Sequence, residues 1–403
     1  MTLRQAVRNV LISYDFANLN GGQAMVALTS AKLLADAGLK VHYLAATGTP
    51  DPLLDHPNIE LHHLGQKDIL TEPNRAVAMS RGLWNHKAAK SLKKLAAKFD
   101  PADTIHHCHG YAKALSPAIG PELTNGHLRS VYTMHEYFLG CPNGGFYDYQ
   151  ANEICTRKAL SVSCLKTNCD VRHPAHKAWR VARQVATWGP GQMPRNMKDV
   201  IYISQTQRRA MAPYFGENTR LHYLPNPAPL ELDFKADVAA NDTFLFIGRL
   251  NPEKGGLLFA KAAREAGVKA VFCGDGAEAD AIRAENPDAI ITGWQTPDQV
   301  DQWIRKARCL VFPSLWYEGQ PLVPLEALTR GVPVIAGRWT AASESITDGV
   351  NGYIMDTPSL EELTAKLKAI ANAPLAPDPA RGTGVSQDEH LSRLVEIYDT
   401  AQA

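Results

Sequence analysis

Two glutamates in one short segment, Glu318 and Glu326, have a setting that suits chemistry on a bound ligand. An apolar run typical of a β-strand ends at Pro313, a loop follows, and an amphipathic helix is predicted to begin near Leu322. Glu318 then lies in the loop and Glu326 in the first turns of the helix, so both carboxylates can flank one concave site. Open α/β sheets bind ligands at such carboxyl ends of strands. The alternative is that both are surface glutamates, the usual place for this residue type.

Residues 248–255 (Gly-Arg-Leu-Asn-Pro-Glu-Lys-Gly) carry two positive charges across a predicted turn. Arg249 and Lys254 are five positions apart, so the turn lets both side chains converge on one anion. A diphosphate would accept charge-assisted hydrogen bonds from both, each contributing about 1.5–3 kcal/mol. The segment therefore predicts an anion site, and surface charges that hold no ligand are the alternative.

Three histidines and a cysteine crowd one predicted strand, residues 104–110. The group suggests a metal site, but side chains alternate along a strand. His107 and His109 therefore lie on one face, and His106 and Cys108 on the other. The four side chains cannot converge on one ion, and His107 suits a protein core.

Residues 131–136 form another predicted strand, which runs into a loop and ends in His135 and Glu136. A histidine there can hydrogen-bond a hydroxyl group of a ligand, and the neighbouring acid can orient the ring through its other nitrogen. The alternative for His135 is a structural histidine that satisfies a loop carbonyl group.

Taken in order, these motifs resemble those of the retaining glycosyltransferases of the GT4 family, which have the GT-B fold. That family carries two glutamates with seven residues between them in the same strand, loop and helix setting, and Glu318 and Glu326 match this spacing. Residues 248–255 look like the family's diphosphate loop, and residues 331–336 match the segment after the helix. The resemblance implies an α/β fold of two Rossmann-like domains, each a doubly wound parallel sheet, facing each other across a cleft.

The resemblance also implies roles for individual residues. Glu326 would accept hydrogen bonds from the ribose hydroxyls of a nucleotide-sugar donor, and Glu318 would contact the transferred sugar. The catalytic residues so implied are Glu318, His135, Arg249 and Lys254, with the last two holding the diphosphate. The residues implied to bind substrate, besides Glu326, are Gly21, Gly22, His109, Gly274, Asp275, Trp294, Gly319, Gln320 and Leu322.

Several of these contacts would be made by the backbone or by a ring. Gly21 and Gly22 would bring N–H groups at a helix start to the donor phosphate or the acceptor, although a plain tight turn also explains a glycine pair. Trp294 would support the nucleobase. The family's usual Phe-Gly is Gln320-Pro321 here, so the identity of the sugar does not carry over.

The implied reaction moves a sugar from a UDP- or GDP-sugar to a glycan or a lipid-linked glycan, with retention of the anomeric configuration. In the family the departing phosphate helps to take the acceptor proton, so no side chain is assigned as general base. The sequence contains no Asp-x-Asp triplet, with which the other common transferase architecture holds a metal, so no cofactor is expected for transfer. A catalytically silent nucleotide- or glycan-binding scaffold of the same fold is the alternative.

The order of predicted elements indicates two α/β domains, which suits a chain of 403 residues. The first domain is predicted to cover residues 1–226, with a cysteine-containing insertion at 141–169, and the second to cover residues 227–385. A C-terminal helix, 386–403, resembles one that crosses back to the first domain in this fold. Prolines in residues 225–229 mark the linker.

The first predicted strand, loop and helix open a βαβ unit over residues 8–46. The loop of this unit is not Gly-x-Gly-x-x-Gly, which disfavours an NAD-dependent oxidoreductase. No apolar run approaches the length of a membrane span, and the first residues lack the pattern of a signal peptide. These features predict a cytoplasmic protein.

Charge is unevenly distributed along the chain. Residues 1–228 hold 26 lysines and arginines against 16 acidic residues, and the remainder holds 16 against 25. The basic excess lies largely in two predicted helical stretches, 75–99 and 172–198, which also contain Trp84, Trp179 and Trp188. An anionic membrane surface would bind such stretches and place the protein on the inner face of the membrane. An ordinary solvated basic face is the alternative, and no nucleic-acid-binding module is recognised.

Four of the seven cysteines lie in the predicted insertion, at Cys141, Cys155, Cys164 and Cys169. A structural zinc ion held by four thiolates would order a loop with little apolar content of its own. The spacings are irregular and include no Cys-x-x-Cys, so free thiols are the alternative. Disulfides are not expected in a reducing compartment.

Overall fold

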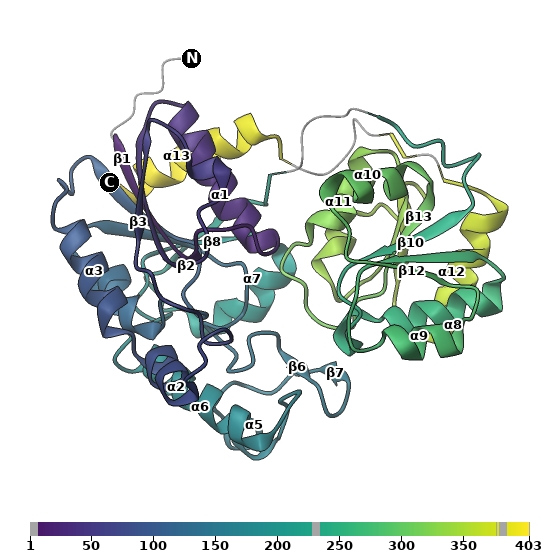
Figure 1. The fold of residues 1–403 in the computed structure, drawn as a ribbon, viewed down its shortest axis with the longest axis horizontal. Coiled ribbons are helices and arrows are strands. Elements are labelled where there is room, and N and C mark those ends of the chain that lie inside the picture. The colour runs from purple at the N-terminus through teal and green to yellow at the C-terminus, as the bar shows by residue number, and fades with distance from the viewer. Residues whose placement is uncertain (1–6, 228–233, 376, 379–384, 403) are drawn as a thin grey trace. The chain divides into compact units, whose positions relative to one another are not determined.

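The computed structural model describes residues 7–227, 234–375, 377–378 and 385–402, and it divides into two compact units (Figure 1). Unit 1 contains the described residues up to Gly145, then Thr156–Asn226, and then the chain from Gln387. Unit 2 contains Phe146–Cys155 and the described residues between Pro227 and Ser386. Each unit has its own parallel sheet and its own hydrophobic core.

Unit 1 is built on a seven-stranded parallel sheet in the order β3-β2-β1-β4-β5-β8-β9. The order reverses direction at β1, which is the doubly wound arrangement that the sequence predicts. The strands are β1 Asn9–Phe16, β2 Lys40–Thr47, β3 Ile59–His63, β4 Thr104–Cys108, β5 Arg129–Thr133, β8 Asp199–Tyr202 and β9 Arg220–Tyr223.

Helices connect these strands and cover the sheet. They are α1 Gly22–Asp36, α2 Arg75–Leu83, α3 His86–Ala96, α4 Gly120–Asn125, α5 Val162–Lys166, α6 Pro174–Trp188, α7 Gln205–Met211 and α13 Gln387–Gln402. Short 3₁₀ turns lie at η1 Pro52–Leu54, η2 Pro117–Ile119 and η3 Ala212–Tyr214.

The basic stretch predicted as one helix over residues 75–99 is two helices. α2 ends at Leu83, and the side chain of Asn85 accepts a hydrogen bond from the backbone N–H of Ala88 at the start of α3. Asparagine favours this N-cap position because its side chain satisfies an N–H group that the helix leaves unpaired. The cap therefore ends one helix and starts the next within a continuous run of helix-forming residues.

The C-terminal helix α13 is part of the core of unit 1. Its Leu394 and Tyr398 pack in one cluster with Val10 and Ile12 of β1. The Tyr398 hydroxyl lies 2.6 Å from Nδ1 of His107, and the other ring nitrogen of His107 lies 2.7 Å from the hydroxyl of Thr133. His107 is therefore the buried core histidine that the sequence suggested.

Unit 2 is built on a six-stranded parallel sheet in the order β12-β11-β10-β13-β14-β15. Alternate residues of β10 pack on opposite faces, with Phe244 and Phe246 in one hydrophobic cluster and Leu245 in the other. The strands are β10 Thr243–Ile247, β11 Lys269–Cys273, β12 Ile290–Gly293, β13 Ala307–Phe312, β14 Val334–Gly337 and β15 Gly352–Met355.

The helices of unit 2 alternate with its strands, as in a second doubly wound domain. They are α8 Gly256–Ala266, α9 Ala279–Glu285, α10 Pro297–Arg305, α11 Leu322–Thr329 and α12 Leu360–Asn372, with 3₁₀ turns at η4 Pro252–Lys254 and η5 Ala341–Ser345. A small antiparallel hairpin adds β6 Tyr147–Asp148 and β7 Glu153–Ile154.

The two units differ from the predicted domains at one hairpin, and the predicted linker is described only in part. The hairpin residues 146–155, assigned from the sequence to the insertion of the first domain, group with unit 2. Pro225, Asn226 and Pro227 of the predicted linker are described, whereas Ala228 and Pro229 lie outside the described residues.

Helix α8 of unit 2 has a glycine at each end. Gly255 precedes it and Gly267 follows it, and both have left-handed backbone, with φ of 71° and 67°. A Cβ atom at Gly255 would lie 2.2 Å from the carbonyl oxygen of Pro313, whereas one at Gly267 would meet nothing within 4 Å. The loop that precedes α8 is therefore held directly against the end of β13, and only a glycine allows this close approach.

We predict that Gly255→Ala destabilises unit 2 considerably more than Gly267→Ala. Left-handed backbone costs an alanine about 1–2 kcal/mol at either position, but only at Gly255 does the new methyl group also meet backbone. Urea unfolding followed by tryptophan fluorescence measures both losses, because Trp316 and Trp339 belong to unit 2. Equal losses in the two variants would show that the loop is not packed against Pro313.

Candidate functional site

Glu318 accepts three hydrogen bonds on a single carboxylate oxygen. Its Oε1 atom lies 2.7 Å from Nζ of Lys254, 2.7 Å from Oγ of Ser314 and 2.7 Å from Nε1 of Trp316. The Lys254 ammonium also lies 4.9 Å from the centre of the Trp316 ring, a distance that allows a cation–π interaction. The structure thus brings together two residues that the sequence singled out separately, 64 positions apart.

This pair is mostly removed from solvent, with side-chain exposures of 18% for Lys254 and 12% for Glu318. Burial by itself would raise the pKa of Glu318. The charge of Lys254 and the three hydrogen bonds outweigh burial and hold that pKa below its usual value. Glu318 is therefore a carboxylate at neutral pH.

Backbone contacts join the Lys254 loop to the Glu318 loop. The N–H of Leu315 donates to the carbonyl oxygen of Glu253 at 2.8 Å, next to the close contact between Gly255 and Pro313. The indole N–H of Trp339 donates to the carbonyl oxygen of Ser314 at 2.8 Å. The two loops therefore behave as one rigid surface at the carboxyl end of the sheet.

The segment around Arg249 is fixed in the same way to the end of β11. A Cβ atom at Gly274 would lie 1.9 Å from the carbonyl oxygen of Gly248, and the N–H of Leu250 donates to the carbonyl oxygen of Asp275 at 2.9 Å. The side chain of Arg249 is exposed, and it has no hydrogen bond or ion pair within the part of the chain that the structure describes. A rigid backbone thus carries an unpaired positive charge.

Glu326 lies in α11 and has the opposite environment to Glu318. Its side chain is largely buried, yet its carboxylate accepts no hydrogen bond from the described residues. Burial raises the pKa of Glu326, and the charge of Arg330 only partly opposes this because Arg330 is paired with Asp301 at 3.0 Å. A sheltered acceptor without a donor is the arrangement expected for a group that receives its hydrogen bonds from a ligand.

The start of α11 offers donors beside these carboxylates. Pro321 occupies the N-cap position and supplies no side-chain hydrogen bond. The N–H groups of Leu322 and Val323 in the first turn therefore lack partners within the helix, and such groups attract anions. Gly319 and Gln320 lie in the preceding loop and are partly buried.

The remaining predicted residues of unit 2 lie at the same edge of the sheet. β12, β11, β10 and β13 are neighbours and parallel, so their carboxyl ends form one row. Trp294 follows β12 with 76% of its surface exposed, and Asp275 follows β11. The sheet thus aligns Trp294, Asp275, Arg249 and Glu318 in the order of its strands.

Unit 1 brings two of its predicted residues into direct contact. Nδ1 of His109 lies 3.0 Å from Nε2 of His135, and the two rings stack at 5.3 Å. Burial lowers the pKa of His135 to about 3 and that of His109 well below its usual value, so both rings are neutral at pH 7. Nε2 of His109 is buried, and it has no hydrogen-bond partner among the described residues.

The face of β4 opposite His107 and His109 carries His106, as strand alternation predicts. Its ring nitrogens lie 2.8 Å from the hydroxyl of Ser13 and 3.2 Å from that of Ser130. Among the described residues no hydrogen bond joins Glu136 to His135, whose Nε2 contacts His109, so the orienting contact predicted for Glu136 is not seen. Burial, only partly offset by the charge of Lys113, raises the pKa of Glu136 to about 7.

The predicted glycine pair starts helix α1 beside the same histidines. Gly21 is the N-cap, with φ of 141°, and Gly22 is the first helical residue. The amide of Gln23 donates to the carbonyl oxygen of His109 at 2.6 Å, and a Cβ atom at Gly110 would lie 2.3 Å from that amide nitrogen. The glycine loop and the His109 strand end are therefore adjacent.

The predicted zinc site stays a prediction. Lys177 is buried, and its ammonium lies 2.9 Å from Sγ of Cys169 and 3.7 Å from that of Cys164. The sulfur atoms of Cys141, Cys164 and Cys169, all in the described part of unit 1, do not all lie within 4.8 Å of one another. Cys155 belongs to unit 2, whereas these three belong to unit 1. A lysine ammonium thus contacts two of the four sulfur atoms that were predicted to hold zinc.

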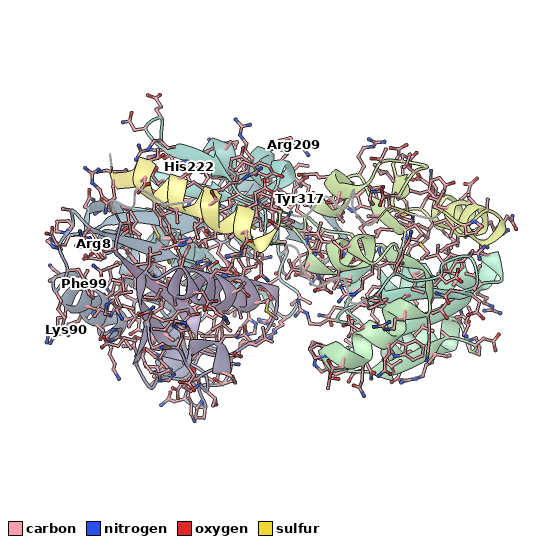
Figure 2. The ribbon with its side chains drawn as sticks, turned by 90° about the horizontal axis from the view of Figure 1, so that it is seen from above. Arg8, Lys90, Phe99, Arg209, His222 and Tyr317 are labelled. Carbon is pink, nitrogen blue, oxygen red and sulfur yellow. The ribbon has the colours of Figure 1, made fainter. Side chains whose placement is uncertain are left out.

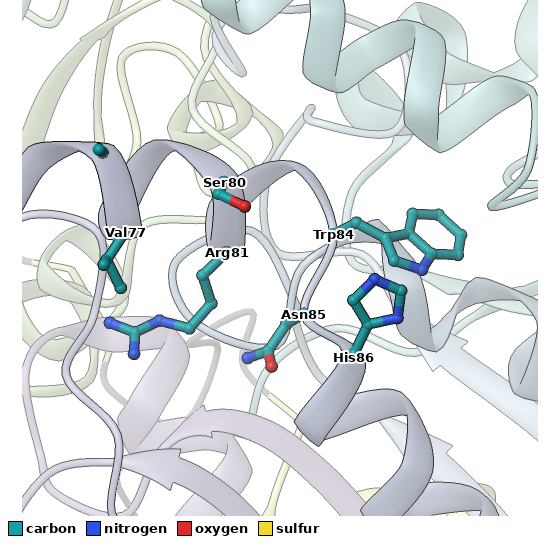
Figure 3. Close-up of a pocket in the computed structure, with 7 residues that line it drawn as sticks. Val77, Ser80, Arg81, Trp84, Asn85 and His86 are labelled. Atoms are coloured by element: carbon teal, nitrogen blue, oxygen red, sulfur yellow. The ribbon is translucent and has the colours of Figure 1, made fainter.

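The basic stretches of unit 1 differ in exposure. Lys177 and Arg183 of α6 are buried, so they are not available to a surface ligand. An open pocket of about 430 Å³ lies over α2 and α3 (Figure 3). Its lining residues are Ala76, Val77, Ser80, Arg81, Trp84, Asn85 and His86.

Sequence families match both units. Residues 20–232 match the family described as Glycosyltransferase Family 4, and residues 241–373 match Glycosyl transferases group 1. The lipopolysaccharide 1,2-N-acetylglucosaminetransferase of Salmonella typhimurium is 31% identical over 132 residues, 28% of this chain and 35% of that protein. The GDP-mannose-dependent alpha-mannosyltransferase of Corynebacterium glutamicum is 32% identical over 117 residues, 29% of this chain and 28% of that protein. The matched part thus spans about a third of the length of these relatives.

Solved structures match the whole chain. Sucrose-phosphate synthase from Thermosynechococcus elongatus aligns with a TM-score of 0.65 at 17% identity, over 99% of this chain and 96% of that one. HepE from Anabaena, in complex with UDP, aligns with a TM-score of 0.65 at 16% identity, over 98% and 100%. These likenesses confirm the GT-B fold that the resemblance implied. The chain belongs to glycosyltransferase family 4.

Proposed function

We propose that this protein is a retaining hexosyltransferase that moves a sugar from a UDP- or GDP-sugar to a glycan or a lipid-linked glycan. The observation that carries the proposal is the edge of the unit 2 sheet, where a Lys254–Glu318 pair, the unpaired Arg249 and the donor-free carboxylate of Glu326 lie on rigid loops. Relatives named for transfer of N-acetylglucosamine and mannose, and a structural neighbour that holds UDP, support the same reaction class.

The donor would bind along the row of strand ends. Trp294 would stack on the base, and Glu326 would accept hydrogen bonds from the ribose hydroxyls. The backbone at Gly274 and Asp275 would lie against the nucleotide. Arg249, Lys254 and the first N–H groups of α11, near Leu322, would hold the diphosphate.

Glu318 would have two roles. Its hydrogen bond fixes the Lys254 ammonium on the surface that faces the diphosphate, and its loop, with Gly319 and Gln320, would contact the transferred sugar. As the bond from the sugar to the diphosphate breaks, negative charge grows on the leaving oxygen. A lysine already held in place stabilises that charge without reorganisation, which is how preorganised groups accelerate a reaction.

The acceptor residues would come from unit 1. The neutral rings of His109 and His135 can exchange hydrogen bonds with sugar hydroxyls, and the Gly21–Gly22 loop brings backbone N–H groups beside them. The acceptor oxygen would form its bond to the sugar on the face that the diphosphate leaves, and the acceptor proton would pass to the departing phosphate. This route retains configuration and requires neither a metal nor a side-chain base.

A catalytically silent scaffold of the same fold is the second candidate. Such a scaffold would bind a nucleotide or a glycan but would not stabilise the charge of a leaving diphosphate. It would therefore not need a preorganised pair of Lys254 and Glu318. Their buried pairing favours the enzyme.

We predict that a nucleoside diphosphate raises the thermal midpoint of the protein, and that Glu326→Ala removes most of the effect. A ligand at 100 times its Kd stabilises by about 2.7 kcal/mol, and losing the charged acceptor of the ribose should cost about 1.5–3 kcal/mol of binding. A thermal-shift panel of UDP, GDP and ADP with their sugars measures this. Glu361→Ala, which removes a first-turn carboxylate of α12, is the matched control. Absence of stabilisation by every compound would exclude the proposed donor site.

We predict that Glu318→Gln lowers turnover about 100-fold or more while donor affinity changes little, because Lys254 loses its anchor although the loop keeps its shape. Lys254→Met should lower both turnover and donor affinity. The loss of activation free energy in the double variant should not exceed the sum of the losses in the two single variants. Asp356→Asn, which breaks the exposed Arg338–Asp356 pair in the same unit, is the control. Full turnover in Glu318→Gln, inversion of the anomeric configuration in the product, or loss of rate with EDTA would each contradict the mechanism.

We also propose that the protein works in the cytoplasm and attaches reversibly to the inner face of the membrane. None of the described helices is long and apolar enough to cross a bilayer. Exposed lysines of α3 follow closely in the chain after exposed apolar side chains of α2 and of the loop before it, and Figure 2 shows the exposed side chain of Lys90. The residues are Leu70, Val77, Met79, Lys87, Lys90, Lys93 and Lys94.

We predict that the protein co-sediments with anionic vesicles at low salt and much less at high salt. Each lysine near an anionic bilayer contributes about 1 kcal/mol, so changing Lys90, Lys93 and Lys94 to glutamate should abolish the binding. The same change at Lys261, Lys366 and Lys368 of unit 2 is the control for net charge. Equal binding to neutral and anionic vesicles, or none to either, would refute the attachment.

A further inference from the structure

Two histidines and a glutamate meet at the edge of the unit 1 sheet, on strands that none of the proposed roles uses. His42 lies on β2, and Glu60 is its partner in the parallel register of the edge strand β3. His62 is two positions beyond Glu60 on β3, so it projects from the same face. Two neighbouring strands thus present three potential metal ligands together.

The ligand atoms of these residues are spaced as a bound ion requires. Nδ1 of His42 lies 3.2 Å from Nε2 of His62. One carboxylate oxygen of Glu60, Oε2, lies 3.3 Å from Nδ1 of His42, and the other, Oε1, lies 3.5 Å from Nε2 of His62. Zinc binds nitrogen and oxygen at about 2.0–2.2 Å, which places neighbouring ligands of a tetrahedral site about 3.3–3.5 Å apart. Histidine, cysteine, aspartate and glutamate side chains can hold a metal ion in groups of three or more. Among the described residues, in this group alone do the potential ligand atoms all lie within 4.8 Å of one another.

The surroundings leave the nitrogens available and the site accessible. A neutral imidazole offers a lone pair to a metal, and neither ring is fully enclosed. Side-chain exposures are 16% for His42 and 21% for His62, whereas Glu60 is 65% exposed and can adjust to an ion. The Phe99 ring, labelled in Figure 2, packs 4.4 Å from that of His42 and fixes one ligand.

We propose that His42, Glu60 and His62 bind a divalent ion of the zinc class, with water in the remaining position. Two imidazoles and one carboxylate are ligands that suit zinc, cobalt or nickel better than magnesium or calcium. Among the described strands, β3 pairs with β2 only, so an ion held between them would stabilise this edge of the sheet. This site lies in unit 1 and is independent of the proposed donor site.

A metal-free network of shared protons is the competing explanation for the same contacts. His42 can donate to His62 or Glu60, and His62 to Glu60, so the three groups can satisfy one another without an ion. Only a measurement of metal binding separates the two explanations, and it must also exclude binding of the metal by the cysteines of unit 1.

The test is titration of the metal-stripped, full-length protein with Co²⁺ and Zn²⁺. We expect one tightly bound Co²⁺ with the visible bands of a tetrahedral nitrogen and oxygen site and no sulfur-to-cobalt charge-transfer band. His42→Gln and His62→Gln should each weaken binding by more than about tenfold. His63→Gln, the next residue of β3 but on the opposite face, should leave it unchanged.

The histidine variants could be unstable, so a second variant is needed that is expected to bind the metal more tightly. The positive charge of Lys98 lowers the pKa of both histidines, after the larger effect of burial, so it also opposes a bound cation. Lys98→Met should therefore tighten Co²⁺ binding several-fold at low salt. A thiolate charge-transfer band that Cys169→Ser removes, affinity unchanged in the histidine variants, or no binding at all would overturn the proposal.

Discussion

The hydrogen bond from Lys254 to Glu318 is the contact on which the arrangement of the candidate donor site depends. It joins two loops that end different strands, and it holds a positive charge at the sheet edge. The contact exists because Gly255 lets its loop approach Pro313 and because Leu315 donates to Glu253 across the same gap. A cluster of backbone contacts thus fixes one side-chain pair, and rigid backbone is what a preorganised electrostatic site requires.

The fold was predictable because its signals are local and repeated. Apolar runs that end in glycine mark the strands of unit 2, and the alternation of side chains along β4 is enough to separate His107 and His109 from His106. The errors have physical causes as well. The break between α2 and α3 depends on one capping side chain, that of Asn85. Lys177 lies in the core beside two cysteines, although a lysine is expected at the surface.

The candidate site was predictable residue by residue but not as an arrangement. Motif spacing identified Glu318, Lys254, Arg249 and Glu326, yet nothing in a single sequence pairs residues that are 64 positions apart. The pairing follows from which strands are neighbours, and β10 lies beside β13 although two strands separate them in the chain. The metal ligands at His42 and Glu60 were missed for the same reason, because strand register is a property of the sheet.

Glu318 and Glu326 show how one motif can supply two kinds of carboxylate. Both side chains are largely buried, and burial alone would raise the pKa of each. Glu318 meets an ammonium, a hydroxyl and an indole N–H, so its pKa falls, whereas Glu326 meets no donor among the described residues, so its pKa rises. The difference lies in the donors around each group rather than in the glutamates themselves. A carboxylate already supplied with donors positions its partners, and one still without them is suited to a ligand that brings hydroxyl groups. The proposed function therefore gives the two glutamates separate steps, with Glu318 organising the charge that would meet the diphosphate and Glu326 selecting the nucleotide.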